Sequence, residues 1–389
     1  MTGWDDVVEL TKRLVAAKSF TSVGEQEAIA VARQAMEALG YADVQVDEVG
    51  NLTGRLPGSG AGCIVFDGHI DTVGVGDPST WTSDPFVATE RDGRLYGRGT
   101  SDMKGSIAAM LVGIARLNHD PAPCDIVVSV SIAEEAVEGY ALGKVLDRYP
   151  ARAVVIGEST SLHLATGQRG RAEIVLETFG IPAHSSTPHL GRNPIRAMGT
   201  LGNVIANLPV PTDDFLGPGT IEITDIMSFP YPGLSMIPER CMATFDRRLL
   251  LGETEADVLS ELQGIVDTYT QNDPTLHAKV SFGADRFQTW TGYQLEAVNF
   301  APAWRTPDDH PVVQAAMNAL VSAGLMPMHT HYAFCTNGSE SAGRRNIPTI
   351  GFGPGDEAEA HRIDESVEIA HLTAAATGYE YLARELIRL

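Results

Sequence analysis

Apolar residues recur at helical spacing in some parts of the chain and form short continuous runs in others. Residues 4–18 and 25–39 show the helical spacing, and Gly40 acts as a stop for the second segment. Segment 103–117 is apolar nearly all round, so we expect a helix packed inside the protein. Continuous runs predict buried strands at 62–71, 125–135 and 153–159, which alternate with the helices 103–117 and 139–149. This alternation is typical of an α/β sheet covered on both faces.

The pattern changes after about residue 170. Segments 171–180, 219–229 and 240–250 alternate polar and apolar residues, and two predicted helices accompany them. Half-exposed strands of this kind indicate a small α+β domain whose sheet is open on one face. The α/β pattern returns from about residue 308. We therefore predict one domain, residues 1–172 and 287–389, interrupted by an inserted domain at 173–286.

Charge and cysteine content narrow the class of protein. The formal net charge of −22 over 389 residues disfavours a nucleic-acid or anionic-membrane partner, because phosphates would be repelled. The four cysteines are far apart and form no CxxC pair, which favours buried thiols in a reducing cytosol. The first residues do not resemble a signal peptide, and no apolar run is long enough to span a bilayer. We expect a cytoplasmic protein.

The segment "GHIDTV" places two polar side chains at the end of a predicted buried strand. Alternate residues of a strand share a face, so His69 and Asp71 would point the same way and Ile70 would face the core. This arrangement would hold an imidazole beside a carboxylate that orients it. A polar cap on the sheet is the alternative interpretation.

More carboxylates and a second histidine occupy equivalent positions. Glu134 and Glu135 end one predicted strand, Glu158 ends another, Asp102 lies at a strand-to-helix turn, and His361 lies in a glycine-rich loop after "IPTIGFGPG". Open α/β sheets bind ligands at this edge, and imidazole with carboxylate ligands suits zinc, cobalt or manganese. One of the adjacent glutamates would bind metal while the other accepts a proton from water.

Each of these residues also has an ordinary structural interpretation. Asp102 could cap the helix that follows it. Glu158 could be an exposed loop carboxylate and His361 a surface histidine. The adjacent glutamates would simply be a solvated strand end. Their joint occurrence at successive strand ends favours a metal site.

Five segments in order, "GHIDTV", "GRGTSDMKG", "AEE", "GES" and "GFGPGDEAEAH", resemble the motifs of the M20 metallopeptidases, and the resemblance runs over nearly the whole chain. That family includes acetylornithine deacetylases, succinyl-diaminopimelate desuccinylases, aminoacylases and glutamate carboxypeptidases. The resemblance implies a hydrolase with two divalent metal ions, most simply zinc. It further implies a catalytic domain with a mixed sheet between helices, and an inserted α+β lid through which two chains form a homodimer.

The resemblance assigns a role to each motif residue. His69 and Glu158 would hold one metal, Glu135 and His361 the other, and Asp102 would bridge them. The peptide bond between Asp102 and Met103 would be cis. Asp71 would accept a hydrogen bond from His69, and Glu134 would be the general base.

Residues outside the metal motifs would contact the substrate. His184 resembles a lid histidine that stabilises the oxyanion in the partner subunit, and Arg248, with Arg247 as a weaker choice, would bind a substrate carboxylate. Asn337 stands where many members carry an aspartate near the pocket, and Ser235 where an asparagine is often found. These two departures affect the choice of substrate and leave the metal ligands untouched.

The main hypothesis is cleavage of the amide bond of a small N-acylated amino acid or a related small-molecule amide. An N-carbamoyl (ureido) group or a dipeptide is the alternative substrate within the same family. From other classes, a non-catalytic metal-binding relative and a two-metal phosphoesterase stay open. Glu134 argues against the first, because a protein that only binds metal has no use for a base beside a ligand. The absence of clustered Arg or Lys near the motifs argues against the second.

Overall fold

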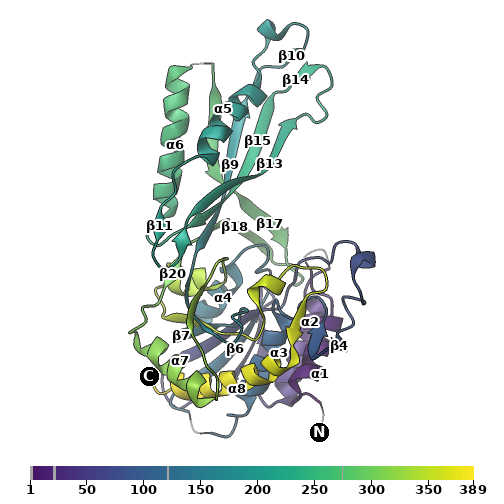
Figure 1. Cartoon of the computed structure of the whole chain (residues 1–389), viewed down its shortest axis with the longest axis vertical. Helices are drawn as coiled ribbons and strands as arrows, with labels where there is room; N and C mark the ends of the chain where they lie inside the picture. Colours follow the sequence, from purple (N-terminus) through teal and green to yellow (C-terminus); the bar gives the residue numbers. More distant parts are fainter. Residues whose placement is uncertain (1–2, 21–22, 121, 274) are drawn as a thin grey trace. The chain divides into compact units, whose positions relative to one another are not determined.

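The computed structural model describes residues 3–20, 23–120, 122–273 and 275–389, which form two compact units (Figure 1). The first unit consists of the described residues within 1–168, 286–296 and 304–389, and the second of those within 169–285 and 297–303. That the second unit acts as a lid and dimerisation domain stays a prediction.

A nine-stranded sheet forms the centre of the first unit, in the order β1-β2-β6-β3-β7-β22-β8-β20 with β21 paired to β8. Its strands are β1 (Ala42–Val46), β2 (Leu52–Leu56), β3 (Cys63–His69), β6 (Asp125–Ser131), β7 (Ala151–Ile156), β8 (Leu164–Gln168), β20 (Trp304–Arg305), β21 (His329–Tyr332) and β22 (Thr349–Gly351). The neighbouring strands β6, β3, β7 and β22 run parallel, whereas β1, β2 and β20 pair antiparallel. The predicted mixed α/β sheet is therefore confirmed, and the carboxyl ends of its parallel strands meet at one edge.

Helices cover both faces of this sheet, so successive residues of a strand, which point to opposite faces, are all buried. Ile64 and Phe66 pack against the helices of one face, whereas Cys63 and Val65 pack with α4 on the other. The helices of the first face are α1 (Val7–Ala16), α2 (Gln26–Ala38), α3 (Lys104–Ala115), α7 (Pro311–Ser322) and α8 (Ile369–Leu386), and α4 spans Tyr140–Arg148. None of the helices in the described part of the chain is long and apolar enough to cross a membrane.

Helix α3 is the most deeply buried of the helices in the described part of the chain, as its uniformly apolar sequence predicts. Every residue from Lys104 to Ile114 is buried. Gly113 lets α3 approach α8 closely, because a Cβ atom there would collide with the backbone carbonyl of Ala376. Lys104 is the one charged side chain of this helix, and its Nζ donates a hydrogen bond to the carbonyl of Ala17 at 2.7 Å.

Two small strand groups have all or part of their residues in the first unit. One is a three-stranded sheet in the order β23-β5-β4, formed by Ser366–Glu368, Arg94–Tyr96 and Thr89–Arg91. The other pairs β17 (Ala284–Gln288) with β18 (Gln294–Val298). At the tip of this pair, the indole of Trp290 donates a hydrogen bond to the carbonyl of Gly50 at 3.3 Å.

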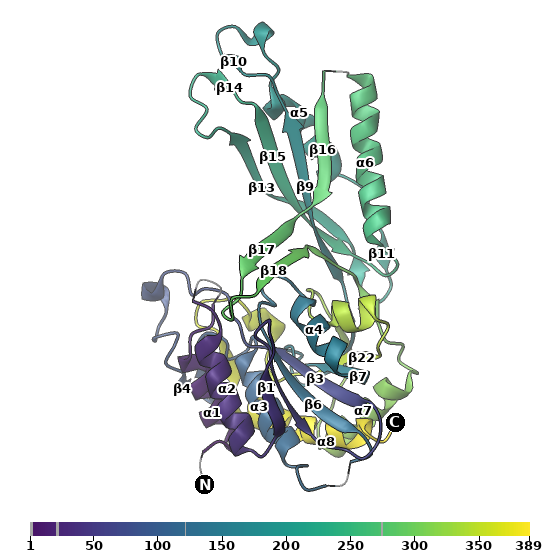
Figure 2. The same cartoon turned by 180° about the vertical axis from the view of Figure 1, so that it is seen from behind.

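The second unit is an α+β domain built on the sheet order β13-β15-β9-β16, with β19 paired to β9 (Figure 2). These strands are β9 (Gly170–Phe179), β13 (Thr220–Phe229), β15 (Arg240–Leu249), β16 (His277–Phe282) and β19 (Phe300–Ala301). Helices α5 (Pro194–Ala206) and α6 (Glu255–Asn272) pack on the apolar face, and alternate residues along β9 and β15 are buried beneath them. Two short pairs, β10 (Ala183–His184) with β14 (Met236–Ile237) and β11 (Thr212–Asp213) with β12 (Gly217–Pro218), complete the unit.

Candidate metal centre

The carboxyl ends of the four parallel strands supply most of the candidate ligands. His69 is the last residue of β3, Glu134 and Glu135 follow β6, Glu158 follows β7, and His361 lies in the loop after β22. These strands are neighbours in the sheet, so residues far apart in the sequence meet at one edge. His361 has φ of 63°, a left-handed conformation that is uncommon for a residue other than glycine.

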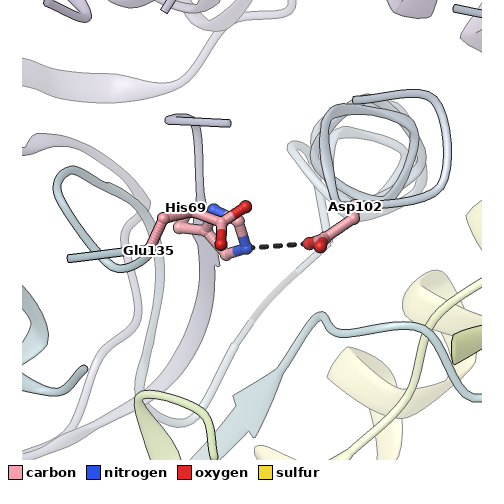
Figure 3. A group of neighbouring side chains, drawn as sticks. All are labelled: His69, Asp102 and Glu135. Carbon is pink, nitrogen blue, oxygen red and sulfur yellow. Dashed lines mark hydrogen bonds and ion pairs between the residues drawn. The ribbon is translucent and has the colours of Figure 1, made fainter. Parts of the chain in front are cut away.

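Asp102 lies between the two histidines. Its Oδ1 is 3.1 Å from Nε2 of His69, and its Oδ2 is 3.2 Å from Nε2 of His361. Figure 3 shows the Asp102 carboxylate at the start of its helix, directed at the His69 ring. The carboxylate does not cap α3, whose N-cap position is Met103, and the Asp102–Met103 peptide bond is cis as the resemblance implied.

Each histidine also meets a carboxylate of its own. Oε1 of Glu158 lies 3.2 Å from Nε2 of His69, and Oε2 of Glu135 lies 3.0 Å from Nε2 of His361. Ligand atoms within 4.8 Å of one another form two overlapping groups, His69 with Asp102 and Glu135, and His69 with Glu134 and Glu158. All five predicted metal ligands therefore come together around Asp102.

Glu134 faces this cluster without a binding partner for one of its oxygens. Its Oε2 is 3.9 Å from Nε2 of His69, and its buried Oε1 accepts no hydrogen bond. A buried carboxylate oxygen without a hydrogen-bond partner lowers the stability of the folded chain, which suggests that it binds a ligand or takes part in a reaction.

The structure places two acceptors of Asp71 beside Nδ1 of His69. Nδ1 of His69 donates to the backbone carbonyl of Asp71 at 3.0 Å, whereas the Asp71 carboxylate lies farther off, at 3.6 Å. The carboxylate instead accepts the backbone amides of Glu134 and Glu135, at 3.1 and 3.0 Å. Because a carbonyl can only accept, Nδ1 carries a hydrogen, and Nε2 is the ring nitrogen that faces the cluster.

Burial and mutual repulsion shift the pKa values of these groups. Burial raises the pKa of Glu158 to about 7 and that of Glu134 well above its usual value, and neighbouring carboxylates add to both shifts. Hydrogen bonds to Asp102 and Glu135 raise the pKa of His361 to about 10. Burial alone would lower the pKa of His69, but the charges of Glu158 and Glu134 raise it well above its usual value.

This donor set fits divalent cations. Four carboxylates and two imidazoles converge, so carboxylates outnumber imidazoles two to one. Burial, with a smaller contribution from neighbouring carboxylates, raises the pKa values of Glu134, Glu135 and Glu158. Oxygen and imidazole nitrogen without thiolate are the ligands that zinc, cobalt and manganese accept.

Asn337 is buried, donates to Asp67 and Ser131, and accepts the backbone amide of Gly139, so both ends of its amide already have partners inside the first unit. Its predicted contact with substrate stays a prediction. Asn337 links β3, through Asp67, to β6, through Ser131.

His184 and Arg248 belong to the second unit. His184 lies on β10, where its Nδ1 accepts the backbone amide of Ser186 at 3.1 Å, which leaves the hydrogen on Nε2. Arg248 lies on β15 with 29% of its side chain exposed, and its Nε contacts Asp246 at 2.7 Å. Their predicted roles toward substrate stay predictions.

Several buried charged residues of the first unit were not predicted from the sequence. Glu25, Asp67, Arg98, Lys104 and Glu365 are all buried in the first unit. The sequence does indicate that Lys104 is unusual, because it is the one charged residue at the start of an apolar helix. Glu25, Asp67, Arg98 and Glu365 had no local signal, since their partners are distant in the sequence.

Comparison with known sequences identifies relatives over the whole chain. The model of the "Peptidase family M20/M25/M40" matches residues 65–385. The Escherichia coli (strain K12) protein "Uncharacterized protein YgeY" is 33% identical over 383 residues, which cover 96% of this chain and 93% of that protein. A succinyl-diaminopimelate desuccinylase of Rhizorhabdus wittichii is 28% identical over 403 residues, covering 98% of each chain.

Solved structures share the fold at lower identity. An M20 family metallo-carboxypeptidase, Sso-CP2 from Sulfolobus solfataricus, matches 99% of this chain and 100% of its own with a TM-score of 0.78 and 16% identity. The Bacillus subtilis YXEP protein, a dinuclear metal-binding peptidase, matches 100% of this chain and 99% of its own with a TM-score of 0.73 and 14% identity.

Proposed function

This chain belongs to peptidase family M20/M25/M40, whose members hydrolyse amide and peptide bonds, and we propose that it is a two-metal amidohydrolase acting on a small N-acylated amino acid or a related amide. One observation carries the proposal. The two oxygens of Asp102 face two different imidazoles, and each imidazole has a further carboxylate within 3.2 Å. A carboxylate shared in this way suits the bridge of a dinuclear site.

The residues divide into two ligand sets. His69 and Glu158 would hold one cation, Glu135 and His361 the other, and Asp102 would contact both. Divalent cations bound there, most simply zinc, would polarise the scissile carbonyl and acidify the attacking water. The His69 carbonyl contact described above keeps Nε2 available as a ligand atom.

Glu134 would move the proton. Its unpartnered Oε1 is buried beside the ligands, so it has no competing hydrogen bond to lose when it accepts the proton of the attacking water. Delivery of that proton to the leaving nitrogen completes hydrolysis and returns Glu134 to its starting state. The Asp71 carboxylate supports this role by holding the Glu134 backbone amide at 3.1 Å.

Relatives support an N-acyl amide as the substrate class. Several relatives at 28% identity over nearly the whole chain are named succinyl-diaminopimelate desuccinylases. Peptides and N-carbamoyl groups are the competing amides. Turnover of a panel of N-acyl, N-carbamoyl and dipeptide substrates, with metal content measured on the same preparation, tests the proposal. Two metals per chain with hydrolysis of N-acyl substrates is the expected result, and metal without any hydrolysis would favour the non-catalytic relative.

The second unit would complete the site within a homodimer. Nε2 of His184 carries a hydrogen, so this residue would donate to the oxyanion in a partner subunit, and Arg248 would bind a substrate carboxylate. Light scattering combined with activity at the same concentration tests this arrangement. A fully active monomer would remove the role of His184 in a partner subunit.

A further inference from the structure

Glu365 is a completely buried carboxylate, 0% exposed, that the proposed chemistry does not use. Its Oε1 accepts two consecutive backbone amides, those of Ser101 at 2.8 Å and Asp102 at 3.0 Å. Its Oε2 accepts from Nη1 of Arg98 at 2.6 Å, and Arg98 is itself only 4% exposed. The carboxylate therefore uses one oxygen for a buried cation and the other for the backbone of a candidate ligand.

These bonds fix a segment that regular structure does not hold. Helix α3 begins at Lys104, so Ser101 and Asp102 precede its hydrogen-bond ladder. Buried amides without a partner are costly, and Glu365 provides the partner for both. Because the Asp102 side chain extends from this backbone, the position of the amides sets the position of the carboxylate that faces both histidines.

Glu365 also joins two ligand loops. It lies four positions after His361, and its own carbonyl accepts the backbone amide of Gly97 at 2.9 Å, next to the pairing of β23 with β5. One residue thereby connects the loop of His361 to the turn of Asp102. These two ligands approach each other at 3.2 Å, so a small change in either loop changes their separation.

The same device occurs on the opposite side of the cluster. The Asp71 carboxylate accepts the consecutive amides of Glu134 and Glu135, as Glu365 does for Ser101 and Asp102. Two buried carboxylates thus each hold a backbone segment that carries candidate site residues. Charge-assisted bonds of this kind are among the stronger hydrogen bonds in proteins.

We propose that Glu365, held in place by Arg98, is a positioning residue that sets the location of Asp102 and its distance from His361. It acts through the backbone and contacts neither substrate nor metal. This inference rests on the proposed function, because the position of Asp102 affects the reaction only if Asp102 binds metal. The amide contacts themselves can be tested without metal or substrate.

The first experiment is hydrogen exchange on the metal-free protein, read by mass spectrometry over residues 99–104 and 107–114. In the unmodified chain the amides of Ser101 and Asp102 should be protected, and unprotected exchange there would overturn the proposal without any variant. Glu365→Gln has one oxygen for two sets of donors, Arg98 on one side and the two backbone amides on the other. Its NH2 group must face one set, which removes either the amide bonds or the Arg98 contact that holds the side chain, so we expect exchange at 101–102 at least about tenfold faster while 107–114 in α3 is unchanged.

The second experiment is a chelator-competition titration with zinc. Glu365→Gln should weaken the binding of at least one of two zinc ions about 10–100-fold, the usual effect of losing a group that orients a metal ligand. The control is Glu368→Gln in the same segment, an exposed carboxylate paired with Arg94 at 3.4 Å, which should bind zinc as the unmodified chain does. Unchanged zinc affinity in a folded Glu365→Gln protein would overturn the positioning role. Failure of the unmodified chain to bind zinc would instead overturn the proposed function.

Discussion

Glu135 and His361 are 226 positions apart in the sequence, yet Oε2 of Glu135 lies 3.0 Å from Nε2 of His361. The sheet brings them together, because β6 and β22 end at the same edge. The His361 side chain is 54% exposed, whereas that of His69 is 2% exposed. The two halves of the cluster therefore differ in their access to water.

This asymmetry predicts different metal losses in two variants. His361→Ala removes one imidazole at the exposed side, so we expect about one metal per chain to remain. Asp102→Ala removes the carboxylate that faces both histidines, so both metals should be lost together with activity. Metal analysis after desalting distinguishes the outcomes, and two metals retained in Asp102→Ala would contradict the bridging assignment.

Glu134→Gln separates chemistry from metal binding. The variant keeps the shape of the side chain but cannot accept a proton, so we expect kcat to fall about 10²–10⁴-fold with metal content unchanged. Glu37→Gln, an exposed carboxylate on α2 paired with Arg33 at 3.0 Å, is the control and should keep its activity. Turnover of Glu134→Gln at the rate of the unmodified chain would remove the general-base assignment.

Chelation should abolish amide hydrolysis, and zinc, cobalt or manganese should restore it. Removal of the cations leaves the clustered carboxylates to repel one another, so the protein should also lose stability. Zinc at a hundred times its Kd would add about 2.7 kcal/mol to the free energy of unfolding, which a thermal melt detects. Activity that survives chelation, with metal analysis confirming removal, would contradict a metal-dependent reaction.

Glu25 predicts a pH dependence of stability in the chelated protein. Burial, with a smaller contribution from the Asp71 charge, raises its pKa from 4.5 to about 7 in the folded chain. The folded state then holds a proton that the unfolded state has released. This term is fully favourable below pH 4.5 and is lost as the pH rises to about 7, at roughly 1.4 kcal/mol per pKa unit.

Glu25→Gln removes this titration. The melting temperature of the variant minus that of the unmodified chain should increase between pH 5 and pH 8, as followed by calorimetry. Glu27→Gln, an exposed residue in the same helix, serves as the control and should show a flat difference. A flat difference for Glu25→Gln as well would contradict the raised pKa.

Adjacent arginines on β15 predict opposite phenotypes. Arg247 is buried and bound to Glu253 and Glu261 at 2.6 and 2.7 Å, so Arg247→Ala should lower the free energy of unfolding by about 2 kcal/mol. Arg248→Ala should leave the melting temperature nearly unchanged and raise KM for substrates with a free carboxylate. An unchanged KM for free-carboxylate substrates in Arg248→Ala would remove the carboxylate contact.

The sequence predicted those parts of the site that depend on local pattern and on strand order. Parallel buried strands share an edge, so polar residues that end such strands were expected to meet, and His69, Glu135 and Glu158 do so. The helix at 103–117 followed from its uniform apolarity. Both inferences use properties that a short stretch of sequence contains.

Other features depend on contacts between distant backbone groups. The bond of His69 to the Asp71 carbonyl, and the bonds of Glu365 to Ser101 and Asp102, involve groups whose neighbours only the fold decides. The hairpin of β17 and β18 also escaped prediction, because its residues carry no clear apolar alternation. The amide of Asn337 likewise has buried partners from other strands.

The close approach of α3 to α8 at Gly113 has a consequence for mutational tolerance. Gly113 lies 11 residues from Asp102, about 16 Å along the helix axis, with buried side chains on every side between them. A larger residue there has no free volume to occupy, so it must displace the helix as a rigid rod. Substitution of this glycine should therefore give a folded but inactive protein, as substitution of an active-site residue would. Gly113 itself contacts none of the candidate site residues.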